Sequence, residues 1–115
     1  AVTAGACYVA RWTTVQQSEL KESIKKAMKM KGFRFVEVVS QCPTAFGRRA
    51  GFRDVSEMIK WFRENSIPTK QAEKMSDKDL MDKIVVGEFS ESQRPTLVET
   101  MQQTSEEAQK EVEKI

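Results

Sequence analysis

The chain has 115 residues, 19 of them basic and 17 acidic, and its 39% hydrophobic content is typical of one globular unit. It contains no histidine, which excludes a Ser-His-Asp triad and a histidine-ligated zinc site, and its two cysteines are too few for a disulfide framework. No apolar run approaches the roughly 20 residues that cross a bilayer, and no signal peptide is recognisable, which predicts a cytoplasmic location without a membrane partner.

A strand, a helix and a second strand are predicted in the first third of the chain. Cys7–Arg11 is the first strand, and Ser18 is the expected N-cap of a helix that ends at Gly32. Phe33–Ser40 is nearly continuous in β-branched and aromatic residues, which is typical of a central strand buried on both faces. The three elements predict a βαβ unit, and hence an α/β fold with a partial parallel sheet and flanking helices. The apolar face of the helix comprises Leu20, Ile24, Ala27 and Met28.

The loop at 41–52 is the expected location of a ligand, because it follows the second strand at the carboxyl end of a parallel sheet. Asp54 caps the next predicted helix, and Thr69–Lys83 is polar and predicted to be a linker with one short helix capped by Ser76. Ile84–Phe89 is the last predicted strand. The predicted buried stripe of the helix after Asp54 comprises Val55, Met58, Ile59 and Phe62.

A polar helical tail is predicted at the end of the chain, where apolar or small residues recur every three or four positions. We therefore expect an α/β region at 1–92 and a helical tail at 93–115. The tail's narrow stripe comprises Leu97, Met101, Thr104, Ala108, Val112 and Ile115.

Cys42 is the main candidate for chemistry within the loop. From the residues alone it could be a small buried hydrophobe, or a metal ligand whose companion ligands lie outside this chain, because two cysteines cannot build a zinc or iron–sulfur site. Cys7 lies inside a strand and is predicted to be structural. Arg48 and Arg49 could bind a carboxylate or phosphate, or could form a solvated pair at the loop tip.

Binding to nucleic acid is the alternative to an enzymatic role, as one form of a non-catalytic interaction module. The lysines of the first helix provide a basic face, but no aromatic side chains are interleaved with them, which argues against nucleic acid as a partner. The candidate stacking residues are instead assigned to the core; they are Phe33, Phe35, Trp61 and Phe62.

Four segments of the chain resemble one family in order. They are AGACYVAR at Ala4–Arg11, SQCPTAFGRR at Ser40–Arg49, EMIKWFRENSIP at Glu57–Pro68 and KIVVGEF at Lys83–Phe89. They resemble the C-terminal part of the β subunit of 2-oxoacid:ferredoxin oxidoreductases, most closely the branch specific for 2-oxoglutarate. The match covers roughly three quarters of the chain, and several motifs in the same order make a chance similarity improbable.

The resemblance implies the C-terminal portion of a thiamine-diphosphate-binding fold. The family's enzymes oxidatively decarboxylate a 2-oxo acid on thiamine diphosphate held with Mg²⁺, transfer the acyl group to coenzyme A, and send electrons through a 4Fe-4S cluster to ferredoxin. Cys42 then matches the cysteine that supplies the fourth cluster ligand after the strand at Phe33–Ser40. Cys7 matches a position where a small Thr or Ser is usual, so the resemblance keeps it structural.

The family's thiamine-binding motif, which begins with Gly-Asp-Gly and ends in an Asn pair, is absent. We therefore expect a piece of a longer subunit that needs its α subunit, is inactive alone and binds no cofactor alone. The distal carboxylate of 2-oxoglutarate needs a cationic partner, and Arg48 or Arg49 is the candidate because of its loop position, although either could meet coenzyme A or a neighbouring subunit. Pyruvate or another 2-oxo acid is the alternative substrate, and Ala50 stands where the family has a polar residue.

Overall fold

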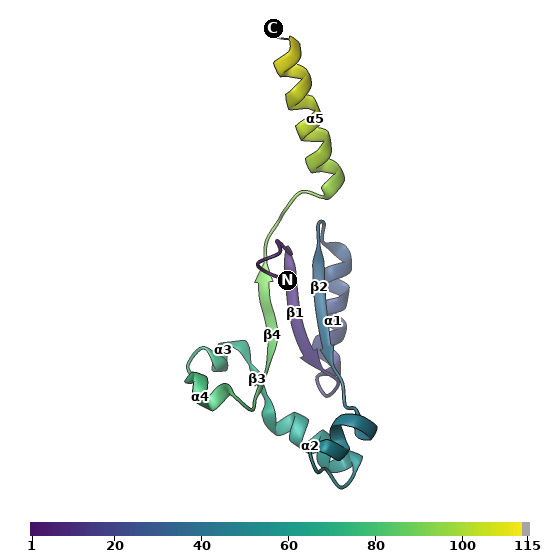
Figure 1. Cartoon of the computed structure of the whole chain (residues 1–115), viewed down its shortest axis with the longest axis vertical. Helices are drawn as coiled ribbons and strands as arrows, with labels where there is room; N and C mark the ends of the chain where they lie inside the picture. Colours follow the sequence, from purple (N-terminus) through teal and green to yellow (C-terminus); the bar gives the residue numbers. More distant parts are fainter. Residues whose placement is uncertain (114–115) are drawn as a thin grey trace.

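A four-stranded sheet with the order β2-β1-β4-β3 organises the chain (Figure 1). The structure is a computed structural model that describes residues 1–113. Its strands are β1 (Tyr8–Thr13), β2 (Arg34–Val39), β3 (Ser66–Pro68) and β4 (Ile84–Glu91). Its helices are α1 (Gln17–Lys29), the short π-helix η1 (Pro43–Gly47), α2 (Val55–Asn65), α3 (Thr69–Ala72), α4 (Asp77–Leu80) and α5 (Leu97–Glu113).

The predicted β1-α1-β2 unit is confirmed. Strands β1 and β2 pair in parallel, with Tyr8 opposite Arg34, and α1 packs against one face of both strands (Figure 1). Tyr8 is fully buried beneath the helix, because an aromatic ring at the first inward position of β1 fills the space above Ala10 and Ala27. Partly buried side chains surround this core; they are Trp12, Met30 and Val36.

The sheet is mixed, which corrects the expectation of a parallel one. Strand β4 is parallel to β3 but antiparallel to β1. The three-residue β3 carries no readable periodicity in the sequence, and its crossover through α3 and α4 sets the direction of β4. The first part of β4, Ile84–Val86, pairs with β3, and the part from Gly87 onward pairs with β1. Gly87 has φ +135°, and a Cβ there would lie 2.9 Å from Oγ1 of Thr69.

Strand β2 is an edge strand, so its prediction as a central strand buried on both faces is wrong. Phe33 is 54% exposed, Phe35 42% and Val38 44%. The interior strands are β1, which lies between β2 and β4, and β4, which lies between β1 and β3. Apolar residues on both faces of β2 indicate a strand that needs cover on both sides, but α1 covers only one face of this sheet (Figure 1).

Helix α1 begins one residue before the predicted cap. Gln16 is its N-cap, and Ser18 lies inside the first turn. Ser23 and Ala27 are the residues that α1 buries, whereas Met28 is 77% exposed and Ile24 is also exposed. The predicted apolar stripe is therefore only partly packed: the helix turns Ser23 toward Trp12, and Ile24 and Met28 line an open surface pocket beside β2.

Helix α2 and the segment after it follow local capping rules. Asp54 accepts a hydrogen bond from the Glu57 backbone at 2.9 Å, as predicted for an N-cap. Met58 and Phe62 are buried as expected, but Val55 is exposed because it lies in the first turn, outside the packed face. The linker contains two short helices rather than one, and its second helix, α4, is capped by Ser76 as predicted.

Helix α5 projects away from the sheet (Figure 1). Thr96 and Glu99 exchange hydrogen bonds that cap its start, and Lys31 forms an ion pair with Glu99 at 2.8 Å. The predicted stripe stays exposed from Leu97 to Val112, so it does not pack within residues 1–113, and the position Ile115 lies outside the described residues. No helix among residues 1–113 is both long and apolar enough to cross a membrane.

The uncovered edge of β2 leads us to expect self-association of the isolated chain. Exposed apolar strand edges pair with other copies or exchange elements. Sedimentation at high protein concentration should therefore detect dimers, and Val38→Lys should weaken them because a charge on an edge strand opposes pairing. Met81→Lys, at an exposed position outside the sheet, is the matched control. A clean monomer would contradict the prediction.

Candidate functional site

The loop after β2 forms a short turn with Cys42 at its start. Pro43 begins η1, and the backbone carbonyl of Cys42 accepts a hydrogen bond from the Gly47 N–H at 2.8 Å. The Cys42 side chain is exposed, with Sγ 4.0 Å from Oγ1 of Thr44. The loop therefore presents an accessible thiol at the carboxyl end of β2.

The environment of Cys42 favours its thiolate. Backbone N–H groups of Phe46 and Ala45, followed by the Thr44 hydroxyl, lie against the sulfur and lower the pKa of the Cys42 thiol. The thiolate is the form that binds metal ions. Cys42 is therefore exposed and has a lowered thiol pKa, two properties that suit a metal ligand.

Cys7 differs from Cys42 in each of these respects. It is fully buried, and its Sγ donates to the carbonyls of Lys31 and Phe33 at 2.9 Å each. Gly32 lies directly above it, since a Cβ on that glycine would lie 3.1 Å from the sulfur. The environment agrees with the predicted structural role of Cys7.

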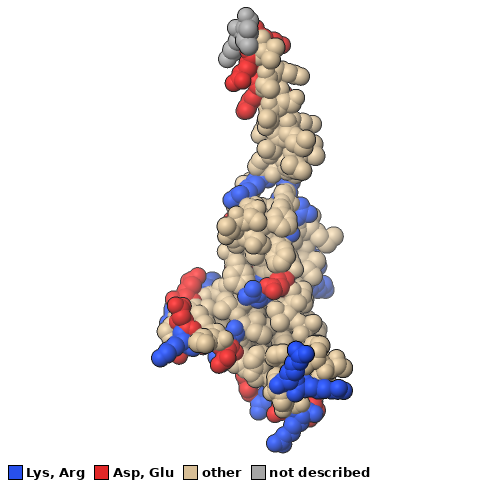
Figure 2. All heavy atoms as spheres, in the orientation of Figure 1, with Lys and Arg blue, Asp and Glu red and all other residues tan. Residues whose placement is uncertain are grey.

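Arg48 and Arg49 follow Cys42 on the same loop, directly after η1. Both side chains are exposed, and within residues 1–113 neither forms an ion pair. Basic side chains gather at the end of the molecule that carries η1 and α2 (Figure 2). The structure thus leaves both guanidinium groups free to bind an anion that approaches this end.

Cys42 has no companion metal ligands in the described part of the chain. No group of three Cys, Asp or Glu side chains within residues 1–113 could hold a metal ion together. A cubane cluster needs four protein ligands, so this chain supplies at most one of them through Cys42.

The aromatic cluster of Phe46, Phe52 and Trp61 lies beside the Cys42 loop and joins it to α2. Ring centroids are 6.1 Å apart for Phe46 and Phe52, and 6.0 Å for Phe52 and Trp61. Sequence reasoning assigned Trp61 to the core and did not connect it with the loop. The available signal was the spacing of aromatic residues on either side of the predicted Asp54 cap.

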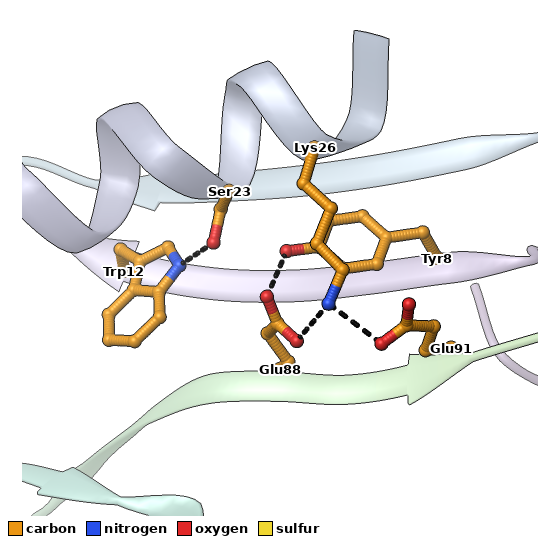
Figure 3. Close-up of polar contacts among 6 residues, drawn as sticks. All are labelled: Tyr8, Trp12, Ser23, Lys26, Glu88 and Glu91. Carbon is orange, nitrogen blue, oxygen red and sulfur yellow. Dashed lines mark hydrogen bonds and ion pairs between the residues drawn. The ribbon is translucent and has the colours of Figure 1, made fainter. Parts of the chain in front are cut away.

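Sequence reasoning also missed a polar network between α1, β1 and β4 (Figure 3). Tyr8 donates to Glu88 at 2.7 Å, and Lys26 donates to Glu88 and Glu91 at 2.7 Å each. Burial raises the pKa of Tyr8. Burial alone would raise the pKa of Glu88 as well, but its bonds to Lys26 and Tyr8 outweigh that effect and lower it. The network joins α1 to β1 and β4, and it depends on the antiparallel pairing that the sequence did not predict.

Comparisons with known proteins identify the same class of enzyme subunit as the sequence motifs. No family model matches the chain. The chain is 49% identical over 111 residues to 2-oxoglutarate synthase subunit KorB of Methanocaldococcus jannaschii, covering 96% of this chain and 41% of that protein. It is 49% identical over 94 residues to the KorB subunit of Methanothermobacter marburgensis, covering 82% of this chain and 33% of that protein.

A solved structure agrees in both fold and sequence. It is the 2-oxoglutarate:ferredoxin oxidoreductase from Magnetococcus marinus with 2-oxoglutarate, coenzyme A and succinyl-CoA bound. The TM-score is 0.65 with 26% identity, over 93% of this chain and 37% of that one. The matches confirm the resemblance to 2-oxoacid:ferredoxin oxidoreductase subunits. Within that class, the sequence relatives are KorB subunits of 2-oxoglutarate synthase, and the chain spans about two fifths of the length of the first of them.

Proposed function

We propose that this chain is the C-terminal part of the β subunit of a 2-oxoglutarate:ferredoxin oxidoreductase and contributes to its thiamine-diphosphate-binding fold. The observation that carries the proposal is 49% identity to KorB over nearly the whole chain. The complete enzyme would convert 2-oxoglutarate and coenzyme A to succinyl-CoA and carbon dioxide, with ferredoxin as electron acceptor. It would need the remainder of the β subunit and an α subunit, and the chain alone is inactive.

Cys42 would be the chain's ligand to a 4Fe-4S cluster. Its exposed sulfur, at the end of β2 and beside backbone N–H groups, suits a thiolate that must reach iron held largely by other segments. When bound, the cluster accepts electrons singly and passes them to ferredoxin. The chain's part is to supply one iron ligand from the loop that follows the carboxyl end of β2.

Thiamine diphosphate and Mg²⁺ would be held elsewhere. The chain lacks the Gly-Asp-Gly and Asn-pair motif, and residues 1–113 contain no cluster of acidic or cysteine side chains for a metal ion. We therefore assign no residue of this chain to that cofactor.

A chimeric subunit tests the proposal. The segment of M. jannaschii KorB that matches this chain is replaced by it, and the chimera is produced with the other subunits of that enzyme. We expect 2-oxoglutarate-dependent reduction of ferredoxin that requires coenzyme A. A chimera that assembles with full iron content but gives no such reduction would contradict the proposed function.

Arg48 and Arg49 are proposed to bind the distal carboxylate of 2-oxoglutarate. A desolvated bidentate pair contributes on the order of 1.5–3 kcal/mol. Alanine at either position in the chimera should therefore lower kcat/KM for 2-oxoglutarate more than for pyruvate. Arg53→Ala, at a further exposed arginine of this region, is the matched control. Equal losses on both substrates would indicate a contact with coenzyme A or another subunit instead.

A further inference from the structure

The turn that carries Cys42 depends on contacts from outside itself. It is five residues long, and its residues are exposed except for Gly47. A π-helical turn of this length has poor intrinsic stability, because its hydrogen-bond geometry is unfavourable and only Arg48 and Arg49 continue it in helical conformation. The position of the Cys42 sulfur therefore depends on what the turn packs against.

Two sets of contacts join this turn to α2. Gly47 lies against Met58, since a Cβ on the glycine would lie 3.5 Å from both Cε of Met58 and the Cys42 carbonyl oxygen. The Gly47 carbonyl also accepts a hydrogen bond from the Phe52 N–H at 3.0 Å. Gly47, whose N–H binds the Cys42 carbonyl, thus lies between Met58 of α2 and the backbone of Phe52.

The aromatic cluster supplies the second set. Phe46 lies on the turn itself, and its ring centroid is 6.4 Å from that of Trp61 and 6.1 Å from that of Phe52. Trp61 lies on α2 itself, next to the buried Phe62, so its contacts with Phe46 and Phe52 join the turn to that helix. Trp61 is therefore the ring that connects the turn with a fixed part of the fold.

We propose that Trp61 is a positioning residue for Cys42. Through Phe46 and Phe52 it holds the turn at Pro43–Gly47 in the one arrangement that aims the Cys42 sulfur outward beside the backbone N–H groups. The role of this sulfur toward a cluster rests on the proposed function, whereas the fixing of the turn is a property of this chain alone.

Hydrogen exchange of the isolated chain tests the fixing of the turn. In Trp61→Ala, the backbone N–H groups of Gly47, Ala50 and Phe52 should exchange roughly tenfold faster, because two ring contacts that close the turn are lost. Trp61→Phe keeps an aromatic ring and should restore most of the protection. Phe33→Ala, which removes an exposed ring at the opposite end of β2, is the matched control. Phe52→Ala provides a second variant if Trp61→Ala disrupts α2, which far-ultraviolet circular dichroism would reveal.

The chimeric enzyme tests the consequence for the sulfur. Trp61→Ala should leave Cys42 as a ligand but shift the reduction potential and broaden the electron paramagnetic resonance signal of the cluster, with recovery in Trp61→Phe. Unchanged exchange at Gly47, Ala50 and Phe52 would overturn the inference, as would an unchanged potential and signal. Loss of the cluster from the unsubstituted chimera would instead contradict the proposed function, and the exchange rates would then decide the inference by themselves.

Discussion

Cys42→Ala in the chimeric β subunit is expected to remove the intact 4Fe-4S cluster and reduce ferredoxin-dependent activity to background. A cubane needs a protein ligand at each of its four irons, and no other cysteine in the chain can replace the lost thiolate because Cys7 is fully buried. Iron and sulfide analysis, together with visible absorbance and electron paramagnetic resonance of the purified enzyme, measures the loss.

Cys7→Ser is the matched control for this substitution. A serine hydroxyl can still donate to the carbonyls of Lys31 or Phe33, which the Cys7 thiol contacts, so the fold should be retained. The cluster content of Cys7→Ser should equal that of the unsubstituted chimera. A full, oxygen-stable four-iron cluster in Cys42→Ala would remove Cys42 from the ligand set.

Tyr8→Ala is expected to lower the free energy of unfolding of the chain by about 3–5 kcal/mol, the range found when large buried aromatic side chains are truncated. Tyr8 has no exposed surface, and its ring lies between α1 and the sheet, so its removal leaves a cavity at the centre of the core. Equilibrium urea unfolding followed by circular dichroism measures the change.

Tyr8→Phe separates the ring from its hydroxyl. It keeps the packing but removes the hydrogen bond to Glu88, which retains its bond to Lys26, so the expected loss is only about 1–2 kcal/mol. A similar loss in both variants would mean that the polar network of Figure 3, rather than packing of the ring, dominates the contribution of Tyr8.

The features that could be predicted from the sequence are those that depend on neighbouring residues. Asp54 and Ser76 were recognised as caps because a short side-chain oxygen must satisfy backbone N–H groups two or three residues further on. The β1-α1-β2 unit was predictable because a strand, an amphipathic helix and a second strand in succession form a crossover whose two strands pair in parallel. The cap formed by Thr96 and Glu99 follows the same local rule and was within reach of the sequence, but it was not identified.

Features that depend on distant segments could not be predicted in this way. The apolar sequence of β2 shows that both of its faces favour burial, but not whether this chain supplies the cover, and β2 is exposed here as an edge strand. The direction of β4 depends on the crossover from β3. The network of Lys26 with Glu88 and Glu91 could not be predicted either, because it requires that direction. At the candidate site, the loop position of Cys42 was predictable, whereas the packing of Trp61 against that loop required the fold.

Strand β4 changes its pairing partner at Gly87, which therefore connects two parts of the sheet. Ile84–Val86 is bonded to β3, and the strand from Gly87 onward is bonded to β1. Gly87 combines a backbone conformation that L side chains rarely adopt with the Thr69 side chain in the space a Cβ would fill. The orientation of α2 and β3 relative to the core of β1, β2 and α1 therefore depends on Gly87, a position where no side chain fits. Strain applied to the α2–β3 segment would reach the core through Gly87, through the loop that joins β2 to α2, and through the contact between Ser66 and Thr13.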